Sequence, residues 1–595
     1  MGRLERLAIG AQEIRAAGRL LGTLPKVLPN AKWSTARLLD ERVRRAPEDA
    51  ALLYLERRYT WRELDAEVDR WAHALRAAEI GRGDGVPLLM DNRPEFLFAM
   101  TALSRIGAVA ALINTGIAGP ALAHAIRVSG PKRMIVGTEH AAKVRALFEG
   151  QTDFDSLGQQ DILEQRDAEF PDSANFASMD ALLEVQPNGR PSGLPDPLAS
   201  ECGSYIYTSG TTGMPKAAII TNSRFIMAGA AFAKLITDMK PSDVLYMTLP
   251  LYHSTGMFAG WSCVLQSGAC MALQRKFSAS RCWDDIERYE ATIFVYIGEL
   301  CRYLLHQEER PSETRHRLRL AMGNGLRPDI WEEFQNRFGI PSIREFYGAT
   351  EGNSVLVNVT GERGKIGRLR AGLAILDCDA ETGEVIRNAE GRCECVEEGE
   401  KGLLVARINA ALRFDGYVDR EASEKKILHG VFNEGDTFFN TGDLVGLGEN
   451  GWISFADRVG DTFRWKGENV STNEVAEILN RAPGVLESNV YGVRVPGADG
   501  RAGMASLNCD DTFSIDGFAT FVVEELPGFQ RPYFVRLQRD MRITGTFKHQ
   551  KFDYRREAFD LSQVDDPLYL LDDGKYVQLD RTLYEALMSG EKVLR

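Results

Sequence analysis

The sequence predicts a multi-domain α/β protein with a large N-terminal domain, which includes a β-rich subdomain, and a small α+β C-terminal domain. The chain has 595 residues, more than one hydrophobic core normally serves, so at least two domains are expected. Strand-like and helical segments alternate from Gly85 onward, the pattern of a parallel sheet covered by helices. Between Gly361 and Asp457, shorter runs with frequent glycines indicate the strand-rich subdomain.

The alternating elements follow one another without an internal repeat. The predicted order is a strand over Val86–Met90, a helix over Pro94–Ile106, a strand over Ala108–Ile113, a helix over Ala121–Val128 and a strand over Arg133–Val136. The segment Asp153–Pro197 is rich in Asp, Gln, Ser and Pro and predicts a surface excursion. A helix over Asn222–Ile236 and a strand over Val244–Leu249 come next. The apolar stretch Gly256–Leu273 contains Gly, Ser and Gln, which favours buried core over a membrane span.

The best candidate for a domain boundary is the segment Asp457–Asp461. There the chain leaves a predicted strand, Trp452–Phe455, and then leads into an apolar-periodic helix over Asn473–Leu479. We therefore expect three parts: an N-terminal tail over 1–40, a large domain over 41–460 and a small domain over 461–595.

The N-terminal tail combines basic and apolar residues. Between Arg3 and Lys32 it carries six basic residues against two acidic ones, with leucines and isoleucines among them. Such a segment can lie on a membrane as a basic amphipathic helix, or it can dock onto its own domain. No continuous apolar signal-peptide core is visible at the N-terminus. The expected location is the cytoplasm, with peripheral contact to the inner face of the membrane as a further possibility.

Charge and cysteine content restrict the partners and the compartment. The net charge of -13, with no strongly basic block, argues against a nucleic-acid partner. Nine cysteines are scattered along the chain without a Cys-x-x-Cys pair. This usage fits a reducing compartment better than a disulfide framework or a zinc site.

The most informative segment runs from Tyr207 to Lys216 and reads Tyr-Thr-Ser-Gly-Thr-Thr-Gly-Met-Pro-Lys. Glycines let the backbone approach an anion, hydroxyl groups add donors and the lysine adds a positive charge. The spacing is not that of a Walker P-loop, and the alternative is a plain surface turn. Because strand-like residues flank the segment, we expect a nucleotide-phosphate loop in a hairpin, formed by Thr208, Ser209, Gly210, Thr211, Thr212, Gly213 and Lys216.

At these residues the chain resembles the adenylate-forming superfamily of acyl-CoA synthetases, luciferases and peptide-synthetase adenylation domains. Within it, the chain is most similar to the very-long-chain acyl-CoA synthetase and fatty-acid transport protein family. The similar segments are Gly213–Ala218, Phe346–Asn353, Gly460–Val470 and Asp566–Tyr569. The resemblance extends from about Trp61 to the C-terminal tail.

The resemblance implies roles for further residues. The loop Gly323, Asn324 and Gly325 would lie along the adenine, on which Tyr347 would stack. Thr350 would hydrogen-bond the α-phosphate, and Glu351 would reach a magnesium ion, which prefers oxygen ligands. His253 would lie beside the acyl pocket as a gate. Taken alone, a single histidine is more often a structural side chain.

Four residues nearer the C-terminus complete the implied site. Asp443 matches the carboxylate that accepts both ribose hydroxyls, and Arg458 matches the basic residue that also meets the ribose. Gly460 would be the hinge about which the small domain rotates. Lys548 would be the adenylation lysine, although Thr546 and Phe547 separate it from Gly545, unlike in related enzymes.

The resemblance implies an ATP-dependent long- or very-long-chain fatty acyl-CoA synthetase. A fatty carboxylate would attack Mg-ATP to give acyl-adenylate and pyrophosphate, and coenzyme A would then displace AMP. Two alternatives remain open at this point. The chain could be a fatty-acid uptake or binding protein with a weak or vestigial nucleotide site, or another carboxylate-activating enzyme, such as a luciferase-like oxidase or an amino-acid-activating domain.

Overall fold

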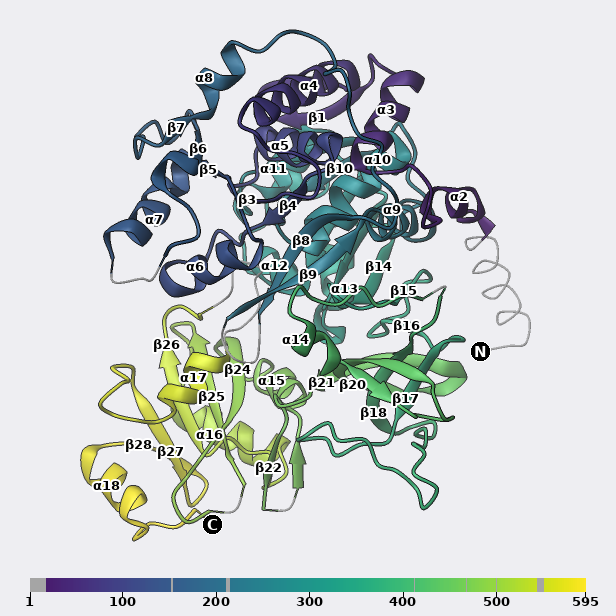
Figure 1. Ribbon diagram of the computed structural model, residues 1–595. Coiled ribbons are helices and arrows are strands. Elements are labelled where there is room, and N and C mark those ends of the chain that lie inside the picture. Colours follow the sequence, from purple (N-terminus) through teal and green to yellow (C-terminus); the bar gives the residue numbers. More distant parts are fainter. Residues whose placement is uncertain are drawn as a thin grey trace. The chain divides into compact units, whose positions relative to one another are not determined.

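The computed structural model in Figure 1 describes residues 18–594 apart from 151–153, 210–213, 411, 467, 499 and 543–550. Internal contacts divide the chain into two units. The first unit comprises Met1–Arg363 and Leu412–Lys426, and the second comprises Gly364–Ala411 and Ile427–Arg595. The boundary expected between residues 460 and 461 therefore falls inside the second unit.

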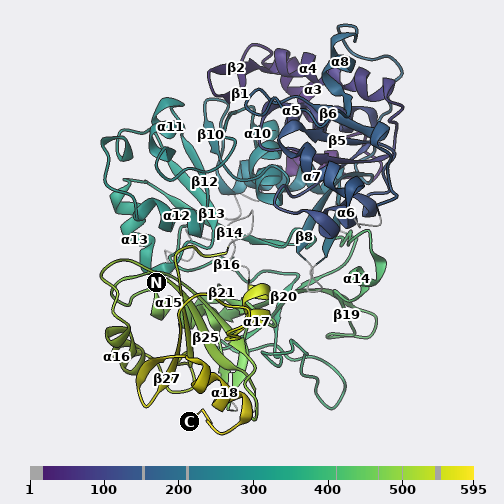
Figure 2. The same cartoon turned by 90° about the vertical axis from the view of Figure 1, so that its left-hand side faces the viewer.

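One sheet of the first unit has the strand order β7-β6-β5-β3-β4-β8-β9, and all of its pairs are parallel except β8 with β9. Its strands are β3 (Gly85–Leu89), β4 (Val109–Leu112), β5 (Met134–Gly137), β6 (Ile162–Gln165), β7 (Ala177–Ser178), β8 (Cys202–Ser209) and β9 (Pro215–Thr221). The helices α4 (Trp61–Ala77), α5 (Pro94–Ile106), α6 (Gly119–Val128), α7 (Thr138–Glu149) and α8 (Met179–Glu184) accompany it. Figure 2 shows α6 and α7 beside β5 and β6. The predicted βαβ alternation is confirmed.

The expected surface excursion over Asp153–Pro197 is wrong in its first half. Strand β6 is fully buried and extends the parallel sheet beside β5. Two of the four residues of β6 are polar, so its sequence does not indicate a buried strand. The carboxylate of Glu164 accepts hydrogen bonds from Ser173 Oγ at 2.7 Å and from the backbone N–H of Ala174 at 2.9 Å, which satisfies the buried charge.

The second sheet of the first unit has the order β15-β14-β13-β12-β10-β11-β1-β2. Its strands are β1 (Ala50–Tyr54), β2 (Arg57–Thr60), β10 (Val244–Met247), β11 (Cys270–Leu273), β12 (Ile293–Ile297), β13 (Leu320–Asn324), β14 (Ile343–Gly348) and β15 (Val355–Asn358). The connecting helices are α11 (Cys282–Arg288), α12 (Gly298–Leu305) and α13 (Pro328–Arg337). The strands β10 to β14 are parallel and largely buried, so their carboxyl ends share one edge of the sheet.

Two segments of π-helix lie within the predicted helix and the apolar stretch that follow the phosphate loop. Helix α9 (Asn222–Ala231) continues as a π-helix over Phe232–Ile236, and a second π-helix spans Thr255–Ser262 before α10 (Cys263–Ser267). Every residue of the second π-helix is buried, which confirms that this apolar stretch is core. Among the described residues, none of the helices is both long and apolar enough to cross a membrane.

The described part of the N-terminal tail docks onto the first unit. It forms a 3-10 turn over Leu21–Thr23, then α2 (Leu24–Val27), and leads to α3 (Thr35–Arg45). Lys234 Nζ donates to Thr23 Oγ1 at 2.7 Å, and Arg19 pairs with Asp238 at 2.7 Å. Residues 1–17 lie outside the described part of the chain. Docking and membrane contact are not exclusive, because the docked segment also has an outward face.

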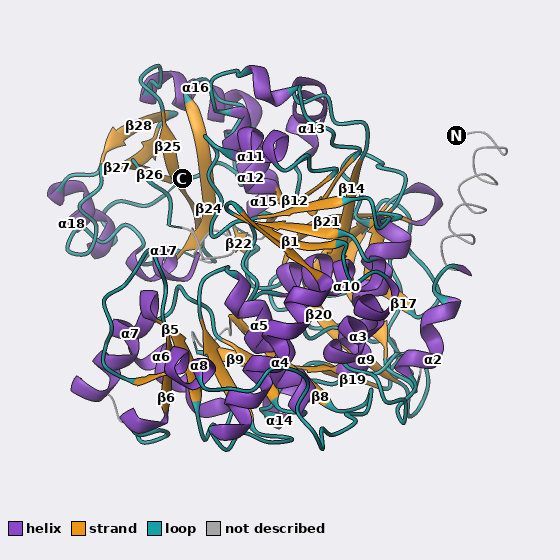
Figure 3. Cartoon of the chain, turned by 90° about the horizontal axis from the view of Figure 1, so that it is seen from above, coloured by secondary structure: helices purple, strands orange, loops and turns teal. Residues whose placement is uncertain are grey.

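The second unit contains two sheets and a hairpin. The first sheet has the order β16-β21-β20-β18-β17, with β19 on β20, and the second runs β24-β25-β26-β27-β28. The strands are β16 (Gly367–Arg368), β17 (Leu373–Leu376), β18 (Lys401–Arg407), β19 (Ile427–His429), β20 (Thr437–Leu447), β21 (Trp452–Arg458), β22 (Phe463–Trp465), β23 (Glu468–Val470), β24 (Val485–Val493), β25 (Ala502–Cys509), β26 (Phe534–Gln538), β27 (Leu568–Asp572) and β28 (Lys575–Gln578). The helices are α15 (Thr472–Leu479), α16 (Ile515–Glu525), α17 (Lys551–Glu557) and α18 (Arg581–Ser589), while α14 (Arg420–Glu424) belongs to the first unit. Figure 3 shows α16 and α18 beside the β24–β28 sheet.

Candidate active site

The predicted phosphate loop connects β8 and β9, which form an antiparallel hairpin. Thr208 pairs with Lys216 across this hairpin, directly at the base of the loop. The ammonium of Lys216 lies 5.9 Å from the ring centroid of Tyr417. Gly210, Thr211, Thr212 and Gly213 lie outside the described residues, and for Ser209 only the backbone pairing with Pro215 is described. The hairpin context is confirmed, whereas phosphate binding stays a prediction.

A second loop follows β14 and carries Thr350 and Glu351. We call residues Ala349–Gly352 the glutamate loop. Both side chains are only 8% exposed. Thr350 Oγ1 donates to Ser254 Oγ at 3.0 Å, so the turn that contains His253 touches the glutamate loop. His253 itself is half-buried. The structure thus brings together a predicted α-phosphate contact and the predicted acyl-pocket gate, which lie about a hundred residues apart.

Arg224 holds the glutamate loop from α9. Its guanidinium donates to the carbonyl oxygen of Glu351 at 2.8 Å and also to the carbonyl oxygens of Ala349, Thr350 and Gly352. Burial lowers the pKa of Arg224, although its guanidinium remains a cation at any physiological pH. Arg224 occupies the first turn of α9, where the helix dipole disfavours a positive charge. The hydrogen bonds to the loop, together with the nearby carboxylates of Asp415 and Glu351, are therefore what stabilise the cation.

The glycine loop, which we define as Gly323–Leu326, joins β13 to α13. The carboxylate of Glu345 on β14 accepts the N–H groups of Gly325 and Leu326, each at 3.0 Å. Tyr296 Oη donates to the same carboxylate at 2.8 Å. Glu345 is 4% exposed, and burial raises its pKa from the ordinary value of 4.5 to about 7.

Close backbone packing also restrains the glycine loop. A Cβ atom on Gly298, the first residue of α12, would lie 1.7 Å from the carbonyl oxygen of Gly325. A Cβ on Gly323 would lie 2.4 Å from the carbonyl oxygen of Tyr296. Gly325 has a φ of +80°, which favours glycine. The loop is consequently fixed by sterics as well as by hydrogen bonds.

Asp443 and Arg458 lie opposite each other on β20 and β21 of the second unit. Arg458 Nε is 3.3 Å from Asp443 Oδ1. Asp443 is 5% exposed, whereas the side chain of Arg458 is 56% exposed. The structure therefore brings these two predicted ribose-binding residues together within one sheet.

Gly460 and the following residues connect that sheet to the C-terminal part of the second unit. Gly460 has a φ of +81°, and no atom lies within 4 Å of where a Cβ would be. The neighbouring Asp461 pairs with Arg555 of α17 at 2.8 Å. Lys548 lies outside the described residues. The nearby Lys551 donates its ammonium to Thr472 Oγ1 at 2.6 Å, so that amine has a structural partner.

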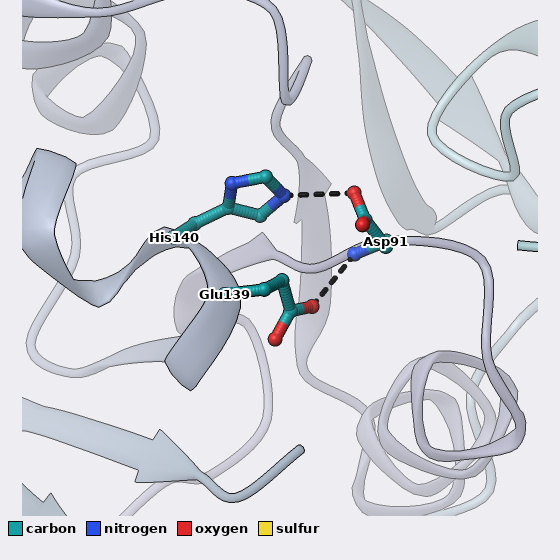
Figure 4. Close-up of side chains that lie close together, drawn as sticks. All are labelled: Asp91, Glu139 and His140. Carbon is teal, nitrogen blue, oxygen red and sulfur yellow. Dashed lines mark hydrogen bonds and ion pairs between the residues drawn. The ribbon is translucent and has the colours of Figure 1, made fainter. Parts of the chain in front are cut away.

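A separate polar cluster stands at the carboxyl edge of the β3–β5 sheet, where Asp91, Glu139 and His140 could together present three ligand atoms to a metal ion. Figure 4 shows His140 Nε2 directed at Asp91 Oδ1, 2.8 Å away, and Glu139 accepting the N–H of Asp91. Burial raises the pKa of Asp91, but the hydrogen bond from His140 helps to bring it below the ordinary value. Arg93 and Arg275 pair with Glu139 and Asp91. These arginines balance the carboxylates, so the cluster is a structural network.

Sequence reasoning missed three residues that hold the predicted loops, namely Arg224, Tyr296 and Glu345. One signal was available for Glu345. It is the one acidic residue of the strand Ile343–Gly348, two positions before Tyr347 and so on the same face. Nothing in the sequence around Arg224 distinguishes it from an exposed helix residue.

Comparison with known proteins yields one matching family and many similar chains. A family model described as "AMP-binding enzyme" matches residues 39–410. Long-chain fatty acid transport protein 6 of Mus musculus is 39% identical, covering 92% of this chain and 89% of the mouse protein. The medium/long-chain-fatty-acid–CoA ligase FadD6 of Mycobacterium tuberculosis is also 39% identical, covering 93% and 90%. The crystal structure of the anthranilate CoA ligase AuaEII with anthranoyl-AMP superposes with a TM-score of 0.76 at 20% identity, covering 91% and 99%, which supports the fold.

Proposed function

Because this chain belongs to the AMP-binding enzyme family, we propose that it is an ATP-dependent fatty acyl-CoA synthetase for long or very long chains. The observation that carries the proposal most is the 39% identity, over nine-tenths of both chains, to a medium/long-chain fatty acid–CoA ligase. The contact between Thr350 and the His253 turn gives it a structural basis, since phosphate and acyl chemistry must meet at one place.

The reaction would proceed in two half-reactions. The fatty carboxylate attacks the α-phosphorus of ATP, a new P–O bond forms, and pyrophosphate leaves with the electron pair of the broken P–O bond. The thiol of coenzyme A, after loss of its proton, then attacks the acyl carbon, and AMP departs. Adenylation is needed because a carboxylate has no good leaving group.

The first unit would bind the triphosphate and the base. We assign the phosphates to Thr208, Ser209, Lys216 and the intervening glycines and threonines, and the adenine to the glycine loop and Tyr347. Thr350 would donate to the α-phosphate. Glu351 fits a magnesium ion, because this buried carboxylate can supply a hard oxygen ligand while ATP supplies the others. Bound magnesium would neutralise charge that develops on the phosphates.

The second unit would supply the ribose contacts and the catalytic lysine. Asp443 accepts the two ribose hydroxyls, with Arg458 beside it. Lys548 would offset negative charge on the α-phosphate, and the occupied amine of Lys551 favours this assignment over its neighbour. These four assignments, Asp443, Arg458, Lys548 and the hinge glycine below, rest on the family resemblance together with the local geometry of the second unit.

A substrate panel tests the proposed reaction. Purified protein is incubated with Mg-ATP, coenzyme A and saturated fatty acids of increasing chain length, and AMP and acyl-CoA are measured. AMP formation that requires both fatty acid and coenzyme A supports the synthetase. Fatty-acid binding without AMP at any chain length would instead support a binding or uptake protein, the activity suggested by relatives called fatty acid transport proteins.

Gly460 is proposed as the hinge between the half-reactions. Its left-handed backbone and the open space around it allow a large dihedral change. Gly460→Pro is expected to slow thioester formation more than pyrophosphate exchange. An equal loss in both assays would reject the hinge assignment.

The N-terminal segment is proposed to touch the inner face of the membrane. Leu21, Leu24 and Leu28 of the docked segment are 66%, 46% and 60% exposed. The sequence before them carries arginines, which would attract anionic lipids. Replacing all three leucines with serine should reduce flotation with phosphatidylserine vesicles, whereas Val185→Ser, at a position that is 77% exposed, should not. Equal flotation of the triple variant would contradict the proposal.

A further inference from the structure

Glu345 is the buried ionisable group of the first unit that contacts the glycine loop and that the proposed reaction leaves without a role. All three described donors to its carboxylate are neutral: the N–H groups of Gly325 and Leu326 and the hydroxyl of Tyr296. A buried carboxylate is costly unless its lone pairs are satisfied, so its presence at 4% exposure needs a reason.

We propose that Glu345 is a positioning residue for the nucleotide, which holds the Gly323–Leu326 loop in the conformation that binds adenine. This inference rests on the nucleotide-binding role proposed for that loop. Glu345 reaches two consecutive amides with its two oxygens, Oε2 to Gly325 and Oε1 to Leu326. One carboxylate thereby fixes the peptide planes on both sides of the turn.

The ionised form is the one that fits the three donors. A protonated carboxyl must turn one oxygen into a donor, and that O–H would then face an N–H or the Tyr296 hydroxyl. Protonation therefore removes a hydrogen bond to the loop or, where the Tyr296 hydroxyl reverses to accept, removes the charge that strengthens the two loop bonds. In a dry site either loss corresponds to roughly a tenfold change in an equilibrium constant or more.

The surroundings of Glu345 contain few groups that could titrate in its place. Tyr296 on β12 and Cys301 on α12 face it, and burial raises both of their pKa values far from neutrality. Gly323 on β13 and Asn358 on β15 are its neighbours across the sheet, and both are uncharged. Burial raises the pKa of Glu345 to about 7. Protonation therefore increases as the pH falls through neutrality.

The expected behaviour follows from these contacts. The dissociation constant and the KM for ATP should rise about tenfold between pH 8 and pH 6, with a smaller change in kcat. Glu345→Gln should keep a raised, nearly pH-independent KM, because the amide cannot accept hydrogen bonds through its nitrogen. Tyr296→Phe removes one donor to the ionised carboxylate, so the pH at which the KM rises should move upward.

The experiment compares wild type, Glu345→Gln, Tyr296→Phe and the control Glu333→Gln, an exposed glutamate on α13. ATP binding is measured by calorimetry and AMP formation by a coupled assay, both from pH 6 to pH 8. Titration of ATP itself affects all four proteins alike. The proposal is supported if Glu333→Gln follows wild type, Glu345→Gln loses the pH dependence and Tyr296→Phe shifts its midpoint upward.

Several outcomes would overturn it. A Glu345→Gln variant with the pH dependence of wild type removes the carboxylate from the explanation. If that variant does not fold, an unshifted midpoint in Tyr296→Phe rejects the proposal on its own. A wild type that binds ATP but never releases AMP rejects the proposed function, while its ATP dissociation constants still decide the role of Glu345. A wild type that does not bind ATP rejects both.

Discussion

Two loops at the edge of the same sheet are each held by one charged side chain, but the charges have opposite signs. The glycine loop presents N–H groups, which the carboxylate of Glu345 accepts. The glutamate loop presents carbonyl oxygens, to which the guanidinium of Arg224 donates. In each case the backbone groups left free by the turn determine the sign of the charge that can hold it.

The charges of these two side chains respond differently to pH. The guanidinium of Arg224 keeps its charge at any physiological pH, whereas the pKa of Glu345 is raised to about 7. Since this value lies above the ordinary 4.5, the carboxyl's contribution to folding is fully present below about pH 4.5 and is lost as the pH rises through about 7. Glu345 holds the glycine loop in its ionised form. ATP binding is therefore expected to be stronger at the upper end of this pH range, and the fold more stable at the lower end.

The largest effect should come from removing the guanidinium of Arg224, which holds the glutamate loop. In Arg224→Met, four carbonyl contacts disappear, and Thr350 and Glu351 lose their fixed position. We expect kcat for AMP formation to fall on the order of 100-fold, as for a misplacement of about 1 Å, with little change in its pH dependence. Arg224→Lys should recover only part of the rate, because an ammonium lacks the planar fork.

Steady-state AMP release at saturating ATP measures this effect, and thermal unfolding reports any loss of folding. Arg317→Met is the matched control, since Arg317 is exposed and pairs with one exposed glutamate, Glu290. Retention of wild-type kcat in a folded Arg224→Met protein would show that the glutamate loop does not depend on its cation.

A smaller effect is expected from a steric change at the glycine loop, which the carboxylate of Glu345 holds. The methyl group in Gly298→Ala would lie 1.7 Å from the carbonyl oxygen of Gly325, so the glycine loop must shift. We expect the KM for ATP to rise at least about tenfold, because relieving this contact needs a shift of roughly an ångström or more. ATP titrations of the initial rate measure it. Gly22→Ala, where no atom lies within 4 Å, should leave the KM unchanged, and an equal rise in both variants would contradict the steric argument.

The smallest effect should come from removing the N-cap of α9, the helix that carries Arg224. Thr221 caps α9, where its Oγ1 accepts the N–H of Arg224 and donates to Asp415 Oδ2 at 3.0 Å. Thr221→Ala should lower the free energy of unfolding by about 1 kcal/mol and reduce kcat by a few-fold. Ser178→Ala, which removes the equivalent cap of α8, should lower stability without affecting kcat. Urea unfolding and AMP release distinguish the two variants. Equal losses of kcat in both would show that the cap of α9 has no particular effect on catalysis.

The sequence predicted the βαβ order, the hairpin around the phosphate loop and the buried apolar stretch, because each depends on local periodicity or on glycine and proline. It did not predict β6, whose Glu164 carboxylate is satisfied by partners several residues away. It also could not place Arg224 under the glutamate loop, since that contact joins residues more than a hundred positions apart. Motif residues were identifiable from the resemblance, whereas the side chains that hold them needed the fold.

The three donors around Glu345 also make the proton a competitor of the nucleotide. Coupling between two ligands is reciprocal, so if ionised Glu345 favours ATP, bound ATP must favour loss of the Glu345 proton. Near pH 7 each binding event would release a fraction of a proton into the buffer. The heat of binding should then vary with the ionisation enthalpy of the buffer, and that variation should shrink in Glu345→Gln. Acidification would act on this chain as a reversible inhibitor that more ATP can overcome.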